Sequence, residues 1–333
     1  MAVAAGTLAL AATVMARTAP PPTAIVSLGD SFISGEGGGR YGASAENGCD
    51  RSATAPIRSA PIEVDEKVNL ACSGAKTVNV WRAVSGGKSH RGEPPQADQL
   101  AAFARRFDVK LVVLTIGAND LGFGAIVAGC ALDWARSSPD DPRYCHDDAQ
   151  RKIEERLPAA TRDLRNAIRE IRAAMASAGE AVASPGRPGG YRLIVMGYAS
   201  PFPAGADFRY SEAGWSRLTE GGCPVWNADA DWARRWALPA IAGMMRAAAV
   251  AEGAEYLDLR RALVGHEVCA RDVSDIDHTR VGSMSDTREW FRPLRLTGRV
   301  RESLHPNRIG QRVIGRCLAR AYAERGASHP CIS

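Results

Sequence analysis

Five short runs of the chain are apolar on both faces, and each ends near glycine or polar residues. They are rich in Val, Ile and Leu, and they read AIVSLGD, VNLACSGA, VKLVVLTIGAND, YRLIVMGYASP and AEYLDL. A continuous apolar run of this length is typical of a strand in a parallel sheet that helices cover on both sides. The pattern therefore predicts five strands.

Longer stretches with a helical period lie between these runs. They cover residues 94–107, 147–180, 227–253 and 306–324. Strand and helix alternate, which predicts an α/β fold with a doubly wound parallel sheet. In such folds the loops that leave the carboxyl ends of the strands build the active site. Three loops of this kind follow Leu28, Leu70 and Ile116.

Two segments interrupt the alternation and are longer than ordinary connections. Residues 34–64 and 266–302 are rich in Gly, Ser, Arg and Asp. Loops of this length are often functional, so we expect both to border the site. Within the second, residues 286–296 are aromatic and cationic and are the best candidate for a rim or a lid.

The N-terminus predicts a leader. Residues 1–16 are apolar and uncharged, and they are too short to cross a hydrocarbon layer of about 30 Å. They are interpreted as a signal peptide, with a buried N-terminal helix as the alternative. A Pro-rich linker follows at 17–23, and residues 24–333 are expected to form one domain that carries the two loop insertions.

The cysteines agree with export. They form an even set of eight without a C-x-x-C motif, which disfavours zinc ribbons and thioredoxin-type chemistry. On the order of a hundred disulfide pairings are possible, and free thiols in a cytosolic protein are the alternative. Pairing nearest neighbours in the sequence would join Cys49 with Cys72, Cys130 with Cys145, Cys223 with Cys269, and Cys317 with Cys331.

The charge composition changes this picture little. The net charge of +5 comes from 42 Lys and Arg residues, 37 of them Arg, against 37 Asp and Glu. The arginines are scattered and form no basic block, so a nucleic-acid partner is not expected. We also expect a monomer without a metal, a cofactor or an integral membrane span.

The stretch IVSLGDSFISGEGGG, residues 25–39, ends the first strand and permits two kinds of chemistry. A phosphate-binding loop would need a Lys after its glycines, and the dinucleotide motif fails because Arg40 occupies the place of its last Gly. The other reading makes Ser31 a nucleophile, which needs a base. Of the six histidines, His305 has the most suitable context, a loop residue ahead of Pro306 and a helix start.

An acyl-transfer site also needs hydrogen-bond donors for an oxyanion. Gly74 lies on a bend after the second strand, in ACSGAK, and Asn119 lies on a bend after the third, in TIGAND. The backbone N–H of Ser31 is a third candidate donor. A lone Asn in a turn is usually structural, so these donors gain weight only together.

Together these motifs occur in the order and approximate spacing of the SGNH, or GDSL-type, hydrolases. GDS comes first, then a Gly in a second loop, GAND in a third, and HPN near the C-terminus. The chain resembles this superfamily over nearly its whole length after the leader, and is most similar to secreted, disulfide-containing actinobacterial esterases and lipases. The resemblance implies a flavodoxin-like three-layer α/β/α sandwich with a parallel five-stranded sheet. It also implies Ser31 as nucleophile, His305 as general base, and Ser31, Gly74 and Asn119 as oxyanion donors.

One position departs from the family pattern. The family usually has Asp three residues before the His, where this chain has Glu302. The Glu302 carboxylate could orient the imidazole as the acid of a triad, or a backbone carbonyl could orient it and leave a Ser–His dyad. Asp30 and Asp120, beside the motif residues, are interpreted as structural hydrogen-bond acceptors in tight loops.

The predicted function is a secreted serine carboxylic ester hydrolase, an esterase or lipase, that forms an acyl-enzyme on Ser31. Two alternatives stay open: an acyltransferase with the same site, and a secreted binding protein with the fold but without catalysis. A lipid, a phospholipid, an acetylated polysaccharide or a polyketide ester would all fit as substrate. Aromatic residues could line an acyl or sugar pocket or could pack; they are Trp81, Trp134, Trp215, Trp226, Trp290 and Phe291.

Overall fold

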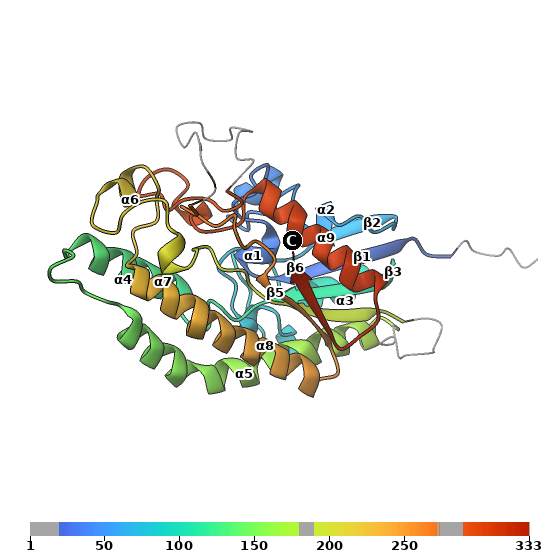
Figure 1. Cartoon of the computed structure of the whole chain (residues 1–333). Helices are drawn as coiled ribbons and strands as arrows, with labels where there is room; N and C mark the ends of the chain where they lie inside the picture. The colour runs from blue at the N-terminus through green and yellow to red at the C-terminus, as the bar shows by residue number, and fades with distance from the viewer. Residues whose placement is uncertain (1–19, 180–189, 272, 274–288, 333) are drawn as a thin grey trace, which may run out of the picture.

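A parallel sheet forms the centre of the computed structural model, which describes residues 20–179, 190–271, 273 and 289–332 (Figure 1). Within these residues the sheet has six strands in the order β2-β1-β3-β4-β5-β6, and neighbouring strands are parallel. Strands β1 to β5 overlap the five apolar runs of the sequence. The strands are β1 (Thr23–Gly29), β2 (Glu66–Asn69), β3 (Asp108–Thr115), β4 (Arg192–Met196), β5 (Glu255–Arg261) and β6 (Ser328–Ile332).

Strand β6 corrects the expectation of a five-stranded sheet. It lies at the edge, beside β5, and contains Pro330. Proline lacks the N–H that a strand with two neighbours needs, so within sheets it is largely confined to edge strands. The sequence pattern misses β6 because this segment is short, partly polar and interrupted by the proline.

Helices cover both faces of the sheet, which gives the three layers of an α/β/α sandwich (Figure 1). Successive side chains of a strand point to opposite faces. Val112 and Leu114 of β3 therefore pack with the helices of one face, and Leu111 and Val113 pack with those of the other. The first face carries α3 (Gln96–Ala104), α5 (His146–Ser177) and α8 (Leu238–Ala251), and the second carries α2 (Pro56–Ser59) and α9 (Arg308–Ala323).

Shorter helices lie in the connections. Helix α7 continues through a π-helical turn into α8, so the helix expected at 227–253 is one nearly continuous element. Helix α4 follows the loop after β3, and the sequence pattern did not predict it. These elements are α1 (Ser31–Ser34), α4 (Phe123–Ala135), α6 (Ser216–Thr219), α7 (Asn227–Trp232), the π turn Ala233–Ala237, and the 3-10 turns Gly42–Ala45, Thr77–Asn79, Ala83–Ser85, Gly205–Asp207 and Val300–Glu302.

The described residues include only part of the expected leader, linker and insertions. Residues 1–16 lie outside them, and so does the linker up to residue 19. The insertion at 34–64 is fully described and contains α2, whereas the insertion at 266–302 is described only in part. The assignment of residues 24–333 to one domain stays a prediction.

All eight cysteines are paired, and each joins its nearest neighbour in the sequence. The disulfides are Cys49–Cys72, Cys130–Cys145, Cys223–Cys269 and Cys317–Cys331. A disulfide reduces the conformational entropy of the unfolded chain, by about 3 kcal/mol for a loop of this order of length in the chain-entropy model. The four disulfides are the pattern expected of an exported protein.

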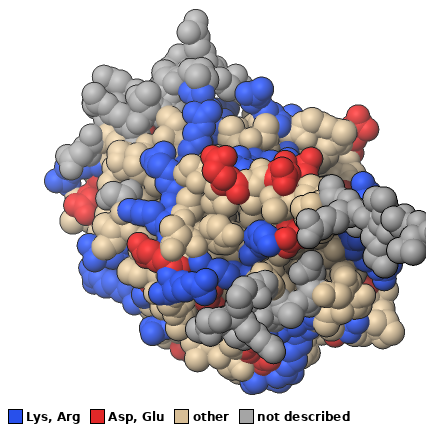
Figure 2. All heavy atoms as spheres, turned by 90° about the vertical axis from the view of Figure 1, so that its right-hand side faces the viewer, with Lys and Arg blue, Asp and Glu red and all other residues tan. Residues whose placement is uncertain are grey.

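Charges of both signs are mixed on the face seen in Figure 2, which is the right-hand side of Figure 1. Basic and acidic groups there are interspersed rather than gathered into separate fields.

Among the helices of the described segments, none combines the length and the apolar character that a membrane crossing requires.

Candidate active site

The loop between β1 and α1 places Ser31 at the carboxyl ends of the parallel strands. Strand β1 ends at Gly29, and Ser31 is the first residue of α1. Gly29 has φ +137°, and a Cβ there would lie 1.9 Å from the carbonyl oxygen of Thr115, so only glycine fits this turn. Asp30 caps α1, because its Oδ1 accepts a hydrogen bond of 3.0 Å from the N–H of Phe32. This agrees with the structural role expected for Asp30.

His305 lies opposite Ser31, with 2.7 Å between its Nε2 and the Ser31 Oγ. Its loop, between the turn Val300–Glu302 and α9, is fixed by backbone hydrogen bonds. The Arg292 N–H donates to the His305 carbonyl over 2.8 Å, and the Leu304 N–H donates to the Arg292 carbonyl over 2.9 Å. The serine and the base, 274 positions apart in the sequence, are thus in hydrogen-bond contact.

Asn307, the last residue of the HPN motif, anchors this loop to α9. Its Oδ1 accepts from the N–H groups of Ile309 and Gly310, over 2.9 and 3.1 Å, and so caps the helix. Its Nδ2 donates to the Glu289 carbonyl over 2.7 Å. The HPN motif therefore includes both the base and the residue that fixes the position of its loop.

The structure does not place Glu302 against His305, contrary to the triad expectation. The Nδ1 of His305 faces the backbone carbonyl of Ser303 at 3.1 Å. The Glu302 carboxylate is buried and accepts from the hydroxyl of Tyr41 over 2.8 Å. Leu304 adopts φ +60°, and in this bent backbone the Ser303 carbonyl meets the ring while the Glu302 side chain contacts Tyr41. The other arrangement left open by the sequence, orientation by a carbonyl, matches this geometry.

Burial sets the protonation of the imidazole. It lowers the pKa of His305 from 6.5 to about 4, although hydrogen bonds to the carbonyls of Ser303 and Arg301 act in the opposite direction. The ring is therefore neutral at pH 7. With Nδ1 facing the Ser303 carbonyl, an acceptor, the proton belongs on Nδ1, which leaves Nε2 to accept the proton of Ser31.

Two further loops bring the candidate oxyanion donors to the same edge. Gly74, at φ +81°, follows β2, and Asn119 follows β3. The Asn119 Nδ2 donates one hydrogen to the Ala75 carbonyl over 2.9 Å, and its second hydrogen remains for another acceptor. Among the described residues, none accepts from the backbone N–H groups of Ser31 and Gly74. These donors are available to an oxyanion.

Hydrogen bonds connect the three loops. The Tyr198 hydroxyl donates to Asp30 Oδ2 over 2.5 Å and accepts from the Ala118 N–H over 3.3 Å. Asp120 accepts from the N–H of Thr77 and, over 2.6 Å, from its hydroxyl. Burial raises the pKa of Asp30 to about 7. Asp30 and Asp120 thus both act as acceptors within loops, as expected from the sequence.

Gly37, in the glycine-rich tail of the GDS loop, contacts the histidine loop. A Cβ there would lie 2.7 Å from the Pro306 carbonyl oxygen and 3.0 Å from the His305 Cβ, and the residue adopts φ +88°. Its N–H donates to the Tyr41 hydroxyl and its carbonyl accepts from Arg292 Nε, each over 2.9 Å. The glycine is needed because two loops approach each other backbone to backbone.

An apolar cavity of about 690 Å³ adjoins Ser31, Asn119 and His305. Helix α4 forms one wall, and the expected rim contributes residues 294–296. Rim residues 286–288 lie outside the described part. None of the six aromatic residues considered for an acyl or sugar pocket lines this cavity. Its lining is mostly aliphatic and includes Phe123, Val127, Ala128, Ala131, Leu132, Leu218, Leu238, Ile241, Leu294, Leu296, Val300 and Leu304.

Sequence reasoning missed α4 as a wall of the site. Phe123, Val127 and Ala131 recur every four residues and all face the cavity, a spacing that could have revealed a helix. The helix is apolar almost all round, however, so it lacks the polar face that makes an amphipathic period visible.

The described part of the chain contains no cluster of His, Cys, Asp or Glu that could bind a metal ion.

Comparisons with known proteins place the chain in a family. The model of the GDSL-like lipase/acylhydrolase family matches residues 27–313. Phospholipase A1 from Streptomyces albidoflavus has a solved structure that is similar at 21% identity and a TM-score of 0.52, over 88% of this chain and 95% of that one. An extracellular lipase from Streptomyces rimosus shows 21% identity and a TM-score of 0.48, over 87% and 94%. No curated protein sequence matches the chain.

Proposed function

The chain belongs to the GDSL-like lipase/acylhydrolase family and is an ester hydrolase, and on that premise we propose that Ser31 is its nucleophile and His305 its general base. The observation that carries the proposal is the distance of 2.7 Å between Ser31 Oγ and His305 Nε2, beside an apolar cavity. A hydroxyl and a neutral imidazole in this contact are the parts of an activated serine.

The reaction proceeds through an acyl-enzyme. Ser31 Oγ attacks the ester carbonyl carbon while its proton passes to His305 Nε2. The tetrahedral intermediate then collapses: the bond to the leaving oxygen breaks, and His305 returns the proton to the departing alcohol. A water molecule, deprotonated by His305, attacks the acyl carbonyl in the same way and releases the acid.

The oxyanion is bound by the N–H groups of Ser31 and Gly74 and by the Asn119 amide. Each donor comes from the loop at the end of a different strand, β1, β2 or β3. Donors fixed in this way need no rearrangement as charge develops, and one of them typically contributes a hundredfold or more to kcat.

The Ser303 carbonyl orients the imidazole and stabilises its charged form by accepting from Nδ1. This makes the catalytic pair a Ser–His dyad with a backbone acceptor instead of a triad with Glu302. Glu302 is a positioning residue: it accepts from Tyr41, whose hydroxyl in turn accepts from the Gly37 N–H beside the histidine loop.

The substrate is an ester with a medium or long acyl chain. The lining of the cavity is aliphatic, and each methylene transferred from water to such a surface contributes about 0.8 kcal/mol. An acetyl group would leave most of the 690 Å³ unfilled. The likeness to a structure named as phospholipase A1 supports a lipid ester as the substrate class.

A panel of p-nitrophenyl esters from acetate to palmitate tests this function. We expect kcat/KM to rise from acetate to at least octanoate, Ser31→Ala to abolish turnover, and a fluorophosphonate to label the native enzyme but not the variant. Hydrolysis that survives Ser31→Ala, or activity confined to acetate, would contradict the proposal. Product analysis with added alcohol distinguishes acyl transfer from hydrolysis.

The protein acts outside the cytoplasm, with residues 1–16 as a cleaved signal peptide. Four disulfides support this location, because they persist in oxidising compartments. N-terminal sequencing of the protein recovered from culture medium tests it, and we expect a start at or near Arg17. Accumulation of full-length protein in the cytoplasm would contradict it.

A further inference from the structure

Two arginine side chains converge beside the candidate oxyanion donors. Gly48 is buried, and a Cβ there would lie 2.8 Å from Nη1 of Arg91 and 2.8 Å from Nη1 of Arg301. The Nη1 atoms of Arg91 and Arg301 are thus no farther apart than twice that distance. Two like charges this close repel each other, so the arrangement favours an anion between or above them.

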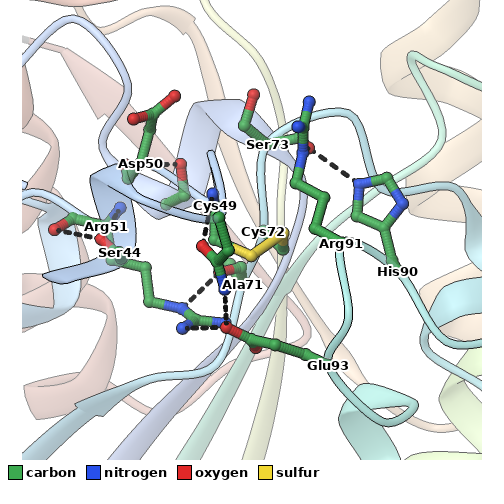
Figure 3. The surroundings of a disulfide bond; sticks show 12 residues. Ser44, Cys49, Asp50, Arg51, Ala71, Cys72, Ser73, His90, Arg91 and Glu93 are labelled. Atoms are coloured by element: carbon green, nitrogen blue, oxygen red, sulfur yellow. Dashed lines mark hydrogen bonds and ion pairs between the residues drawn. A yellow bond between two sulfur atoms is a disulfide. The ribbon is translucent and has the colours of Figure 1, made fainter.

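The described residues supply no carboxylate partner to either guanidinium. Arg91 uses its Nε to donate to the Ser73 carbonyl over 2.9 Å, and neither Arg91 nor Arg301 forms a salt bridge with a described residue. Figure 3 shows the contrast: Arg51 points to Glu93 and pairs with it, while Arg91 points to Ser73. Arg51 is neutralised, and Arg91 is not.

Two nearby acids, Glu302 and Glu36, form no salt bridge with Arg91 or Arg301. Glu302 accepts from Tyr41 and lies 3.5 Å from Arg299. Glu36 is buried and accepts from the Ser73 hydroxyl over 2.5 Å, and burial raises its pKa to about 8. Burial thus favours the protonated, neutral form of Glu36, although the charge of Arg301 acts in the opposite direction.

The pair lies beside the place where the ester must react. A Cβ on Gly74, a candidate oxyanion donor, would lie 3.7 Å from Arg91 Nη2 and 3.6 Å from His90 Nε2. Arg301 is exposed and also lines the cavity that contains Ser31. The Cys49–Cys72 disulfide, drawn in Figure 3, connects the loop of Gly48 to the loop of Gly74.

We propose that Arg91 and Arg301 bind a phosphate group of the substrate, next to the ester that Ser31 attacks. This rests on the proposed function and deepens it. Guanidinium groups match phosphate oxygens in geometry and charge. With the acyl chain in the aliphatic cavity and the phosphate between the two arginines, the preferred substrate is a glycerophosphate ester with an apolar chain.

Kinetics on two soluble substrates test the proposal. Dihexanoyl phosphatidylglycerol and dihexanoylglycerol carry the same acyl chains, and both are used as monomers, below the concentration at which they aggregate. For Arg91→Ala/Arg301→Ala we expect kcat/KM on the phospholipid to fall about tenfold or more, mainly through KM. Because Arg301 also lines the cavity, the decisive quantity is the ratio of kcat/KM for the phospholipid to kcat/KM for the neutral ester, which should fall about tenfold.

The matched control is Arg105→Ala. Arg105 is exposed and lies at the end of α3, just before β3 begins. It is therefore near the amino ends of the strands, whereas Ser31 is at their carboxyl ends. It should change neither substrate's kinetics. Equal losses on both substrates, or no loss on the phospholipid, would overturn the proposal. Retained hydrolysis of the neutral ester would still leave the proposed function intact.

Vesicles distinguish a bound phosphate from attraction to an anionic surface. Wild type and the double variant are compared on vesicles of phosphatidylglycerol and of phosphatidylcholine, both of which carry a phosphate. Loss on both vesicle types, together with the loss on the monomer, supports a phosphate site. Loss only on the anionic vesicles, with monomer kinetics unchanged, would show surface attraction and refute the site. Equal thermal unfolding of the variants confirms that they are folded.

Discussion

At the scale of single residues, the imidazole of His305 lies between the Ser31 hydroxyl and the Ser303 carbonyl. Nε2 accepts in the contact with Ser31, and Nδ1 donates in the contact with Ser303. Neither contact requires a charged partner. Burial therefore has a larger effect on the pKa of this ring than the two carbonyl hydrogen bonds have.

A pH profile tests this protonation state. Because the pKa of His305 is lowered to about 4, kcat/KM on a neutral soluble ester should stay level from pH 7 to about 5. It should then fall by half near pH 4, as the base becomes protonated. An acidic limb centred near 6.5, the ordinary histidine value, would contradict the structure.

The same shift affects stability, so folding must be checked along the profile. Between pH 6.5 and 4 the unfolded chain binds a proton at this position and the folded chain does not. Stability from this group therefore decreases as the pH falls through that window. Circular dichroism at each pH separates loss of the fold from protonation of the base.

Glu302→Gln separates a dyad from a triad. Its Oε1 can still accept from Tyr41, and His305 keeps the Ser303 carbonyl, so kcat should change by less than about fivefold. Where a carboxylate does orient the histidine, its replacement by the amide costs on the order of ten-thousandfold. A loss of that size, with unchanged thermal unfolding, would restore the triad.

At the scale of elements, α4 forms one wall of the cavity that we propose receives the acyl chain. Small side chains such as Ala128 and Ala131 leave room along its inner face, and the rim residues Leu294 and Leu296 also line this space. The helix thus contributes through the volume that it leaves open. That makes it the element in which chain-length preference can be changed.

Ala131→Phe should shorten the preferred chain. The ring would fill part of the cavity, so the ratio of kcat/KM for decanoate to that for butyrate should fall about tenfold, because several methylenes lose their burial. Ala125→Phe is the control: Ala125 is an exposed residue of α4 that does not line the cavity. Equal ratios in the two variants would show that the chain lies elsewhere.

At the scale of the whole molecule, the site joins residues from both ends of the chain. Gly37 is where they touch. Gly37→Ala should push Pro306 and His305 away from Ser31, since a Cβ would lie 2.7 Å from the Pro306 carbonyl oxygen. We expect kcat to fall at least tenfold.

Gly39→Ala is the matched control for this prediction. Gly39 also has positive φ, at +67°, but a Cβ there would meet no described atom within 4 Å. Its substitution should lower stability by about 1 kcal/mol and leave kcat nearly unchanged. Similar kcat values for the two variants would show that the loop contact is unimportant.

Much of this architecture is visible in the sequence, because apolar runs and helical periods record burial. The strands β1 to β5 and the long helices follow from that pattern. Strand β6 does not, since it forms by pairing with β5 at the edge of the folded sheet, where Pro330 is tolerated. Ser31 and His305 were predicted from their motifs, and their contact appears in the structure. The direction of the Glu302 side chain depends on the backbone at Leu304, which no motif encodes.

The separation of Ser31 and His305 by 274 positions has a consequence for biosynthesis. A nascent or unfolded chain carries the serine long before the histidine loop and α9 can dock, so it is inert towards the esters around it. Under the proposed export, the esters inside the cell that makes this hydrolase would not meet the assembled site. If the chain is exported as proposed, the histidine loop and α9 would dock only after the chain has crossed the membrane.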